Sequence, residues 1–159
     1  MAFSVTSPAD EPIIIMTRRF DAPRKLVWRA WTDPYHVARW WGQRSTTTKV
    51  VELDLRPGGN WRFEQHDTSG AVCIFKGTYL EVIEPEKLVN TFGMEGMFED
   101  KVLVETHTFD EVNGKTDYKS VLRFDSFEDR DGMLQSGMEA GAKESMALLD
   151  ELLAELQKQ

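Results

Sequence analysis

Two ionisable side chains, Glu105 and His107, lie two residues apart in the segment LVETHTF. Side chains alternate between the faces of a strand, so a strand here would place both on the face that carries Phe109. Phe109 favours an inward orientation, whereas Val104 on the other face favours the reverse. An inward pair, with Tyr118 added from a neighbouring strand, could act as a general acid and base or could only hydrogen-bond a ligand. An outward pair would be solvated, and the sequence leaves these alternatives open.

The other chemically active residue types are scattered along the chain. His36 and His66 lie in separate segments without the carboxylate spacing of a metal site, and Cys73 is the only cysteine. The motif RPGGN is typical of a hairpin turn, and the sequence contains no nucleophile elbow or phosphate-binding glycine loop. We therefore expect no metal and no cofactor. We assign no catalytic residue, and Glu105 and His107 remain the candidates.

Aromatic residues are concentrated in the segment RAWTDPYHVARWWG, which holds three of the five tryptophans. Trp28 and Trp31 are three residues apart, so on a helix they share a face, and we expect both to pack into the core. Trp40 and Trp41 are adjacent and would point about 100° apart on a helix. We expect one of them to pack under the preceding helix and the other to lean toward the mouth of a cavity.

Strand residues add further rings to the same interior. Trp61 and Phe63 alternate with Arg62 and Glu64, which places both rings on the inner face of a strand. Such rings could fill the core or wall a cavity, and the sequence does not decide between the two. Because the inward positions hold more apolar residues than one helix can cover, we predict an internal ligand-binding cavity. Its predicted lining residues are Trp40, Trp41, Trp61, Phe63, Phe75, Phe92, His107, Phe124, Met138 and Met146.

The start of the chain predicts a loose segment followed by a strand. Residues 1–11 show no regular hydrophobic pattern, whereas the β-branched run Pro12–Phe20 is typical of a strand. Its part Ile13–Thr17 could form a sheet edge that pairs across a homodimer.

Two short helices are predicted next. Asp21 is expected to cap the first helix, and Pro23 suits its first turn. Asp33 and Pro34 are typical of the N-cap and first position of a second helix, which we expect to end at Gly42.

The remainder of the chain changes to a period of two and then to a helical period. From Thr46 to Phe127 the pattern predicts six strands joined by tight turns, with Asn113-Gly114 as the strongest hairpin signal. A long amphipathic helix is predicted from about Asp131 to Gln157. One helix covering one face of a strand meander predicts an α+β helix-grip fold, a curved antiparallel sheet of about seven strands wrapped around a long C-terminal helix.

Composition and charge limit the partners and the compartment. The 159 residues, 41% of them hydrophobic, predict one domain spanning 1–159. The net charge of -8 disfavours nucleic acid and anionic membranes as partners. No uncharged apolar stretch approaches the roughly 20 residues of a membrane span, and the first residues lack the pattern of a signal peptide. With a single cysteine, the expected location is the cytoplasm.

Four motifs resemble one protein family. They are FDAPRKLVWRAWTDPYHVARWWG, DLRPGGNWRF, FKGTYLEVIEPEKLVNTF and RDGMLQSGMEAGAKESMALLDELL. In this order they resemble the activator of Hsp90 ATPase homologue 1-like family, within the START/Bet v 1-like (SRPBCC) superfamily. The resemblance spans about Ile13 to Leu156 and implies a helix-grip fold with an internal apolar cavity.

Three functions follow as hypotheses. The first is binding of a small hydrophobic or aromatic molecule between the sheet and the terminal helix. The second, which the superfamily resemblance implies, is an enzyme of the cyclase or hydrolase type that uses Glu105 and His107. The third is an Hsp90-associated role. We do not expect Hsp90 as a partner, because the co-chaperone that names the family has an additional N-terminal domain for which a first strand near residue 12 leaves no room.

Overall fold

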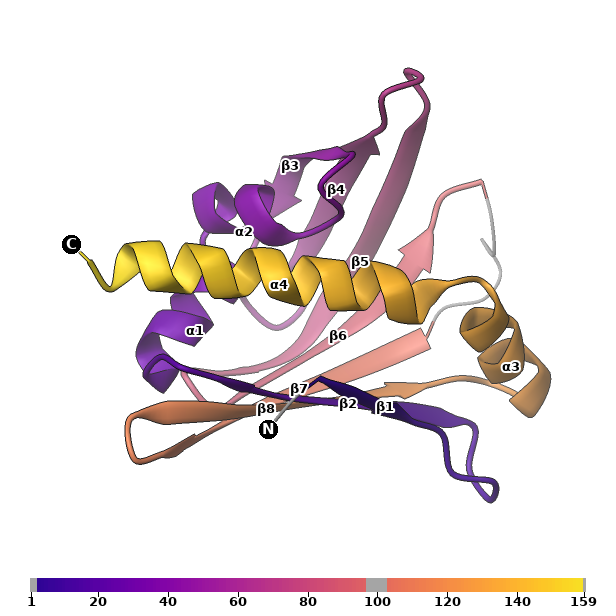
Figure 1. Cartoon of the computed structure of the whole chain (residues 1–159). Coiled ribbons are helices and arrows are strands. Elements are labelled where there is room, and N and C mark those ends of the chain that lie inside the picture. Colours follow the sequence, from indigo (N-terminus) through magenta and orange to yellow (C-terminus); the bar gives the residue numbers. More distant parts are fainter. Residues whose placement is uncertain (1–2, 97–102, 159) are drawn as a thin grey trace.

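The computed structural model describes residues 3–96 and 103–158, which form one curved sheet and four helices (Figure 1). Eight described strands pair antiparallel in the order β1-β2-β8-β7-β6-β5-β4-β3. Their bounds are β1 Ser4–Thr6, β2 Ile13–Phe20, β3 Thr47–Leu53, β4 Asn60–His66, β5 Val72–Ile83, β6 Lys87–Met94, β7 Leu103–Val112 and β8 Lys115–Arg123. Four helices complete the described chain, namely α1 Arg24–Thr32, α2 Pro34–Trp40, α3 Phe127–Gln135 and α4 Met138–Leu156.

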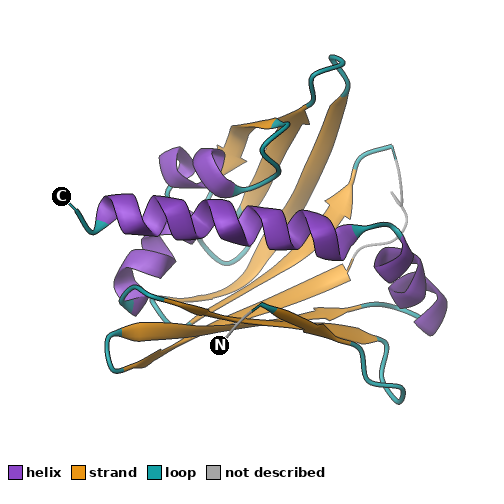
Figure 2. Cartoon of the chain, in the orientation of Figure 1, coloured by secondary structure: helices purple, strands orange, loops and turns teal. Residues whose placement is uncertain are grey.

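The sheet curves around α4. Strands β1, β2 and β8 run beneath the helix, and β3 to β5 rise behind it (Figure 2). The helices α1 and α2 lie beside the C-terminal half of α4, and α3 lies beyond its N-terminus (Figure 1). This arrangement is the helix-grip fold predicted from the element order.

The additional strand is β1, which the sequence did not predict. Residues 4–6 were expected to be loose, but Val5 pairs with Met16 of β2. Three residues are too short to show the alternating pattern that marks a strand. Strand β1 also occupies the edge of β2 that was expected to be open for pairing across a homodimer, since its register reaches Thr17.

The helix starts differ from one another in how they are capped. Asp33 accepts a hydrogen bond from the backbone N–H of Tyr35 at 2.9 Å, so its predicted role as N-cap is confirmed. The prediction for Asp21 is wrong, because Pro23 occupies the N-cap of α1 without a side-chain cap. Instead, the Glu111 carboxylate accepts a hydrogen bond from the backbone N–H of Arg24 at 2.8 Å. A distant strand end therefore supplies the acceptor that the local sequence was expected to supply.

The predicted terminal helix is divided in two. Residues 127–135 form α3, and α4 begins at Met138 after Gly137, whose φ of 85° is left-handed. The remaining turn signals agree with the structure. Asn113 and Gly114 have φ of 54° and 79°, as a two-residue hairpin turn with both residues left-handed requires.

Two apolar clusters lie between the sheet and the helices. The larger joins Leu149 and Leu153 of α4 to Val27 of α1, Val37 of α2 and Phe109 of the sheet. The smaller lies toward α3 and contains buried side chains of β2, β7 and β8, namely Ile14, Met16, Leu103 and Leu122, together with Phe124. The pocket described next lies where these clusters meet.

Candidate functional site

A pocket of about 300 Å³ lies between the concave face of the sheet and α4. Its volume is at the lower end of those typical of small-molecule sites. Aromatic side chains from α1, α2, the loop after α2 and four strands form a large part of the wall, namely Trp31, Trp40, Trp41, Trp61, Phe63, Phe75, Tyr79, Phe92 and Tyr118. The methionines Met16, Met133, Met138 and Met146 contribute further apolar surface.

The rings form two groups around this pocket. In one group, Trp31 lies 4.4 Å from Trp40 and 4.7 Å from Tyr118 between ring centroids. In the other, Trp41 packs edge-on against Phe63 and Phe75 at 5.2 and 4.9 Å. Such edge-on and tilted contacts are favoured by the ring quadrupole. Ring packing within each group fixes the positions of these lining side chains.

Most residues predicted to line a cavity do line this pocket. Those of the predicted set that line it are Trp40, Trp41, Trp61, Phe63, Phe75, Phe92, His107, Met138 and Met146. Phe124 does not line it. It follows the last residue of β8, packs in the smaller apolar cluster, and faces a neighbouring hollow beside α3.

The tryptophans of α1 have different roles from one another. Trp28 is buried and packs edge-on against Phe109, as expected of a core residue. Trp31 was expected to be core as well, but it lines the pocket. It is also the ring that contacts Trp40, His107 and Tyr118. One helix face here meets both the core and the pocket.

Glu105 and His107 point inward from β7. Both line the pocket, and their side chains are 16% and 8% exposed. Oε1 of Glu105 lies 3.6 Å from Nε2 of His107 and accepts a hydrogen bond from the Asn90 amide at 3.0 Å. On the other side of the imidazole, Nδ1 lies 2.7 Å from the Tyr118 hydroxyl. Strands β6, β7 and β8 thus place a continuous polar row in an apolar pocket.

The strand register explains this row. Asn90 is directly opposite Glu105 across β6 and β7, and Tyr79 is directly opposite Asn90 across β5 and β6. Burial raises the pKa of the Tyr79 and Tyr118 hydroxyls above the ordinary value, and the negative charge of Glu105 raises both further. Both phenols therefore keep their protons over the physiological range and can donate hydrogen bonds.

The loop after α2 closes the side of the pocket next to α4. Its residues Gly42 and Gln43 line the pocket, and Ser145 of α4 accepts a hydrogen bond from the backbone N–H of Gly42 at 3.3 Å. The Ser145 hydroxyl in turn donates to the carbonyl of Trp40 at 2.8 Å. These bonds tie the loop to the helix that covers the pocket.

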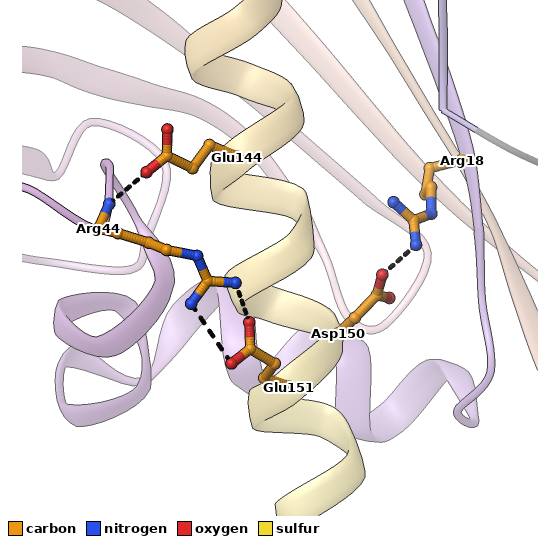
Figure 3. Close-up of polar contacts among 5 residues, drawn as sticks. All are labelled: Arg18, Arg44, Glu144, Asp150 and Glu151. Carbon is orange, nitrogen blue, oxygen red and sulfur yellow. Dashed lines mark hydrogen bonds and ion pairs between the residues drawn. The ribbon is translucent and has the colours of Figure 1, made fainter.

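Ion pairs hold α4 on both flanks (Figure 3). Arg44, next to the lining loop, donates from its backbone N–H to Glu144 at 2.6 Å and pairs through its guanidinium with Glu151. On the opposite flank Arg18 of β2 pairs with Asp150. The hydrogen bond from Arg44 lowers the pKa of Glu151, whereas partial burial raises the pKa of Asp150 and Arg18 opposes that rise.

Comparisons with known proteins place this architecture in a family. Residues 21–154 match the family described as Activator of Hsp90 ATPase homolog 1-like protein. The chain belongs to this family. No protein among those with curated descriptions matches the sequence significantly.

Solved structures of similar proteins share the fold of this Activator of Hsp90 ATPase homolog 1-like chain. A protein from Mycobacterium smegmatis is 27% identical, with a TM-score of 0.86 over 96% of this chain and 97% of that one. A protein from Chromobacterium violaceum is 26% identical, with a TM-score of 0.77 over 89% and 96% of the two chains. One from Arthrobacter aurescens, at 24% identity and a TM-score of 0.88 over 96% and 91%, supports the fold alone.

Sequence reasoning missed several polar residues of this family member's pocket, among them Asn90 and Tyr79. Asn90 shares a strand face with Phe92, which was predicted to point inward, so alternation within LVNTF could have identified it. Tyr79 shares a face with Phe75 in the same way. The described residues contain no cluster of three His, Cys, Asp or Glu side chains suited to a metal ion. None of the described helices is long and apolar enough to cross a membrane.

Proposed function

We propose that the protein binds a small apolar or aromatic molecule in the pocket under α4. The observation that supports this most is a space of about 300 Å³ whose wall carries two groups of packed aromatic rings. Side chains that only filled a core would interdigitate to crystal-like density and leave no space of that size. The polar row of β6 to β8 would fix the orientation of a bound molecule.

The size of the pocket suits a ligand with one aromatic ring. A ring of that size buries about 150–250 Å². At about 25 cal/mol per Å² this contributes roughly 4–6 kcal/mol. Before the cost of association is subtracted, that free energy corresponds to a Kd between about 1 mM and tens of micromolar. Polar contacts would tighten binding further.

Intrinsic tryptophan fluorescence can test the proposal, because Trp31, Trp40, Trp41 and Trp61 line the pocket. Titration with ethylbenzene should change the emission and saturate. The substitution Ala142→Phe, on the pocket-facing side of α4, should abolish the change by filling the space.

The matched control is Ala140→Phe, which adds the same ring at an exposed position of the same helix. It should bind ethylbenzene like the parent protein. Saturable binding that survives in a folded Ala142→Phe variant would show that the ligand lies elsewhere. The absence of saturable binding in the parent protein would contradict the proposed function itself.

A second candidate function is acid–base catalysis, and the inward orientation of Glu105 and His107 favours it. An imidazole held between a carboxylate and a phenol has its ring orientation fixed, which a general base requires. Hydrolysis of 4-nitrophenyl acetate is an accessible assay. Loss of a general base costs about 10²–10⁴-fold in rate, so His107→Gln should lose that activity. His66→Gln, which alters a histidine outside the pocket, should keep it. Equal rates in the two variants would exclude His107 as the base.

A further inference from the structure

The described lining of the pocket includes a carboxylate but no lysine or arginine. Among the described residues that line it, Glu105 is the only carboxylate. Two carboxylates on the flanks of α4 have arginine partners, since Glu151 pairs with Arg44 and Asp150 pairs with Arg18. A carboxylate that is 16% exposed and lacks such a partner is costly unless another group compensates its charge.

Among the described residues, the side chains next to Glu105 are Asn90 and His107. Asn90 donates an amide N–H to Oε1. The Tyr118 phenol, whose pKa is raised by burial, keeps its proton and can donate it to Nδ1 of His107 at 2.7 Å. A neutral imidazole that accepts there carries its own proton on Nε2, the atom that faces Glu105 at 3.6 Å. With the imidazole in that tautomer, the row orients the carboxylate without neutralising its charge.

The surroundings also favour positive charge. The faces of aromatic rings attract cations and repel anions, and rings form a large part of the wall. A neighbouring hollow shares Phe92, Leu103 and Met133 with the pocket and is bordered by Asp125 and Glu128. No lysine or arginine lines that hollow among the described residues. The net charge of the chain, -8, is also negative and so favours a cationic ligand.

We propose that the ligand is an organic amine in its ammonium form, whose charged nitrogen pairs with Glu105 and whose apolar body lies among the rings. This inference rests on the proposed binding function and names the ligand class of the same pocket. A neutral alcohol could hydrogen-bond Glu105 but would leave its charge uncompensated. A carboxylate ligand would place two like charges together in an apolar space.

A series of ligands of nearly equal size separates these possibilities. Benzylamine, benzyl alcohol, ethylbenzene and benzoate would each be titrated into the protein at neutral pH, with tryptophan fluorescence as the readout. Charge-assisted hydrogen bonds are about twice as strong as neutral ones. We therefore expect benzylamine to bind about tenfold more tightly than ethylbenzene or benzyl alcohol, and benzoate to bind least.

The substitution Glu105→Gln keeps the shape of the side chain and an acceptor for Asn90 while removing the charge. In this variant benzylamine should lose its advantage, so that its affinity falls about tenfold while that of ethylbenzene stays the same. Asp110→Asn removes a charge from the same strand at an exposed position and should preserve the advantage.

The outcomes distinguish this inference from the proposed function. If none of the four compounds binds, the binding function itself fails. If ethylbenzene or benzyl alcohol binds as tightly as benzylamine to the parent protein, the pocket binds ligands but does not select amines. A preference for benzylamine that persists in Glu105→Gln would overturn the assignment of Glu105 as the group that pairs with the ammonium.

Discussion

Replacing Tyr118 with phenylalanine removes one buried hydroxyl and leaves the ring in place. Tyr118 is 2% exposed, and its hydroxyl lies 2.7 Å from Nδ1 of His107, which is 6% exposed. After the substitution Nδ1 has lost that partner at a buried position. A buried polar group left unsatisfied costs about 1–3 kcal/mol. Since each kcal/mol shifts the Tm of a domain of this size by about 2–4 °C, Tyr118→Phe should lower the Tm by about 2–12 °C.

A double-mutant cycle tests the cause of that loss. His107→Leu leaves the Tyr118 hydroxyl without its imidazole partner, whereas the double variant removes both polar groups together. Replacing both partners of a hydrogen bond can be nearly neutral. We therefore expect the double variant to be at least about 1 kcal/mol more stable than the sum of the two single losses predicts.

Urea unfolding followed by circular dichroism measures each free energy of unfolding. Tyr35→Phe is the control, because Tyr35 is 84% exposed and its hydroxyl should contribute nothing measurable. Losses that add within about 0.5 kcal/mol would show that the two side chains are energetically independent. The polar row would then be a set of neighbours rather than a coupled unit.

Three further predictions concern the sheet and the ion pair between Arg44 and Glu151 of α4. A methyl group on Gly77 would lie 1.9 Å from the carbonyl oxygen of Thr91, so Gly77→Ala should lower the free energy of unfolding by about 1–3 kcal/mol. The control Gly132→Ala, whose methyl group would meet open space, should not destabilise the protein. Urea unfolding of the two variants compares them. Arg44→Ala should speed the dissociation of bound ethylbenzene in stopped-flow fluorescence, because it removes an ion pair between α4 and the loop that lines the pocket. An unchanged dissociation rate would show that this ion pair does not hold the loop closed. Because the pKa of Glu151 lies below its ordinary value of 4.5, the stabilisation from its pairing with Arg44 is present above that pH and is lost as the pH falls through the lowered pKa. The urea midpoint should therefore fall more in the parent than in Arg44→Ala on acidification from pH 6 to 3.

The regular parts of the fold could be predicted because their signals are local. Alternation marks the strands, and Asn113-Gly114 and Asp33-Pro34 mark a turn and a helix start through their own backbone preferences. The start of α1 could not be predicted in this way, since its acceptor comes from Glu111 on a distant strand. The strand Ser4–Thr6 likewise depends on pairing with β2 and has no pattern of its own.

The candidate site was predictable in its apolar wall and less so in its polar row. Inward positions of strands and α4 identified rings such as Trp61 and Phe75. The orientation of His107 stayed open, because Val104 on the opposite face of the strand argued against it. The sheet register decides the matter by placing Asn90 beside Glu105 and Tyr118 within reach of His107. Register between distant strands is not visible in any one segment.

Nuclear magnetic resonance of isotope-labelled methionine methyl groups tests the central claim most directly. Met16, Met133, Met138 and Met146 line the pocket, and Met94 lies outside it. A ring bound inside would shift the resonances of nearby methyl groups. With ethylbenzene as ligand, we expect saturable shifts at the lining methionines and little change at Met94. Shifts that are absent, or that are largest at Met94, would contradict binding between the sheet and α4.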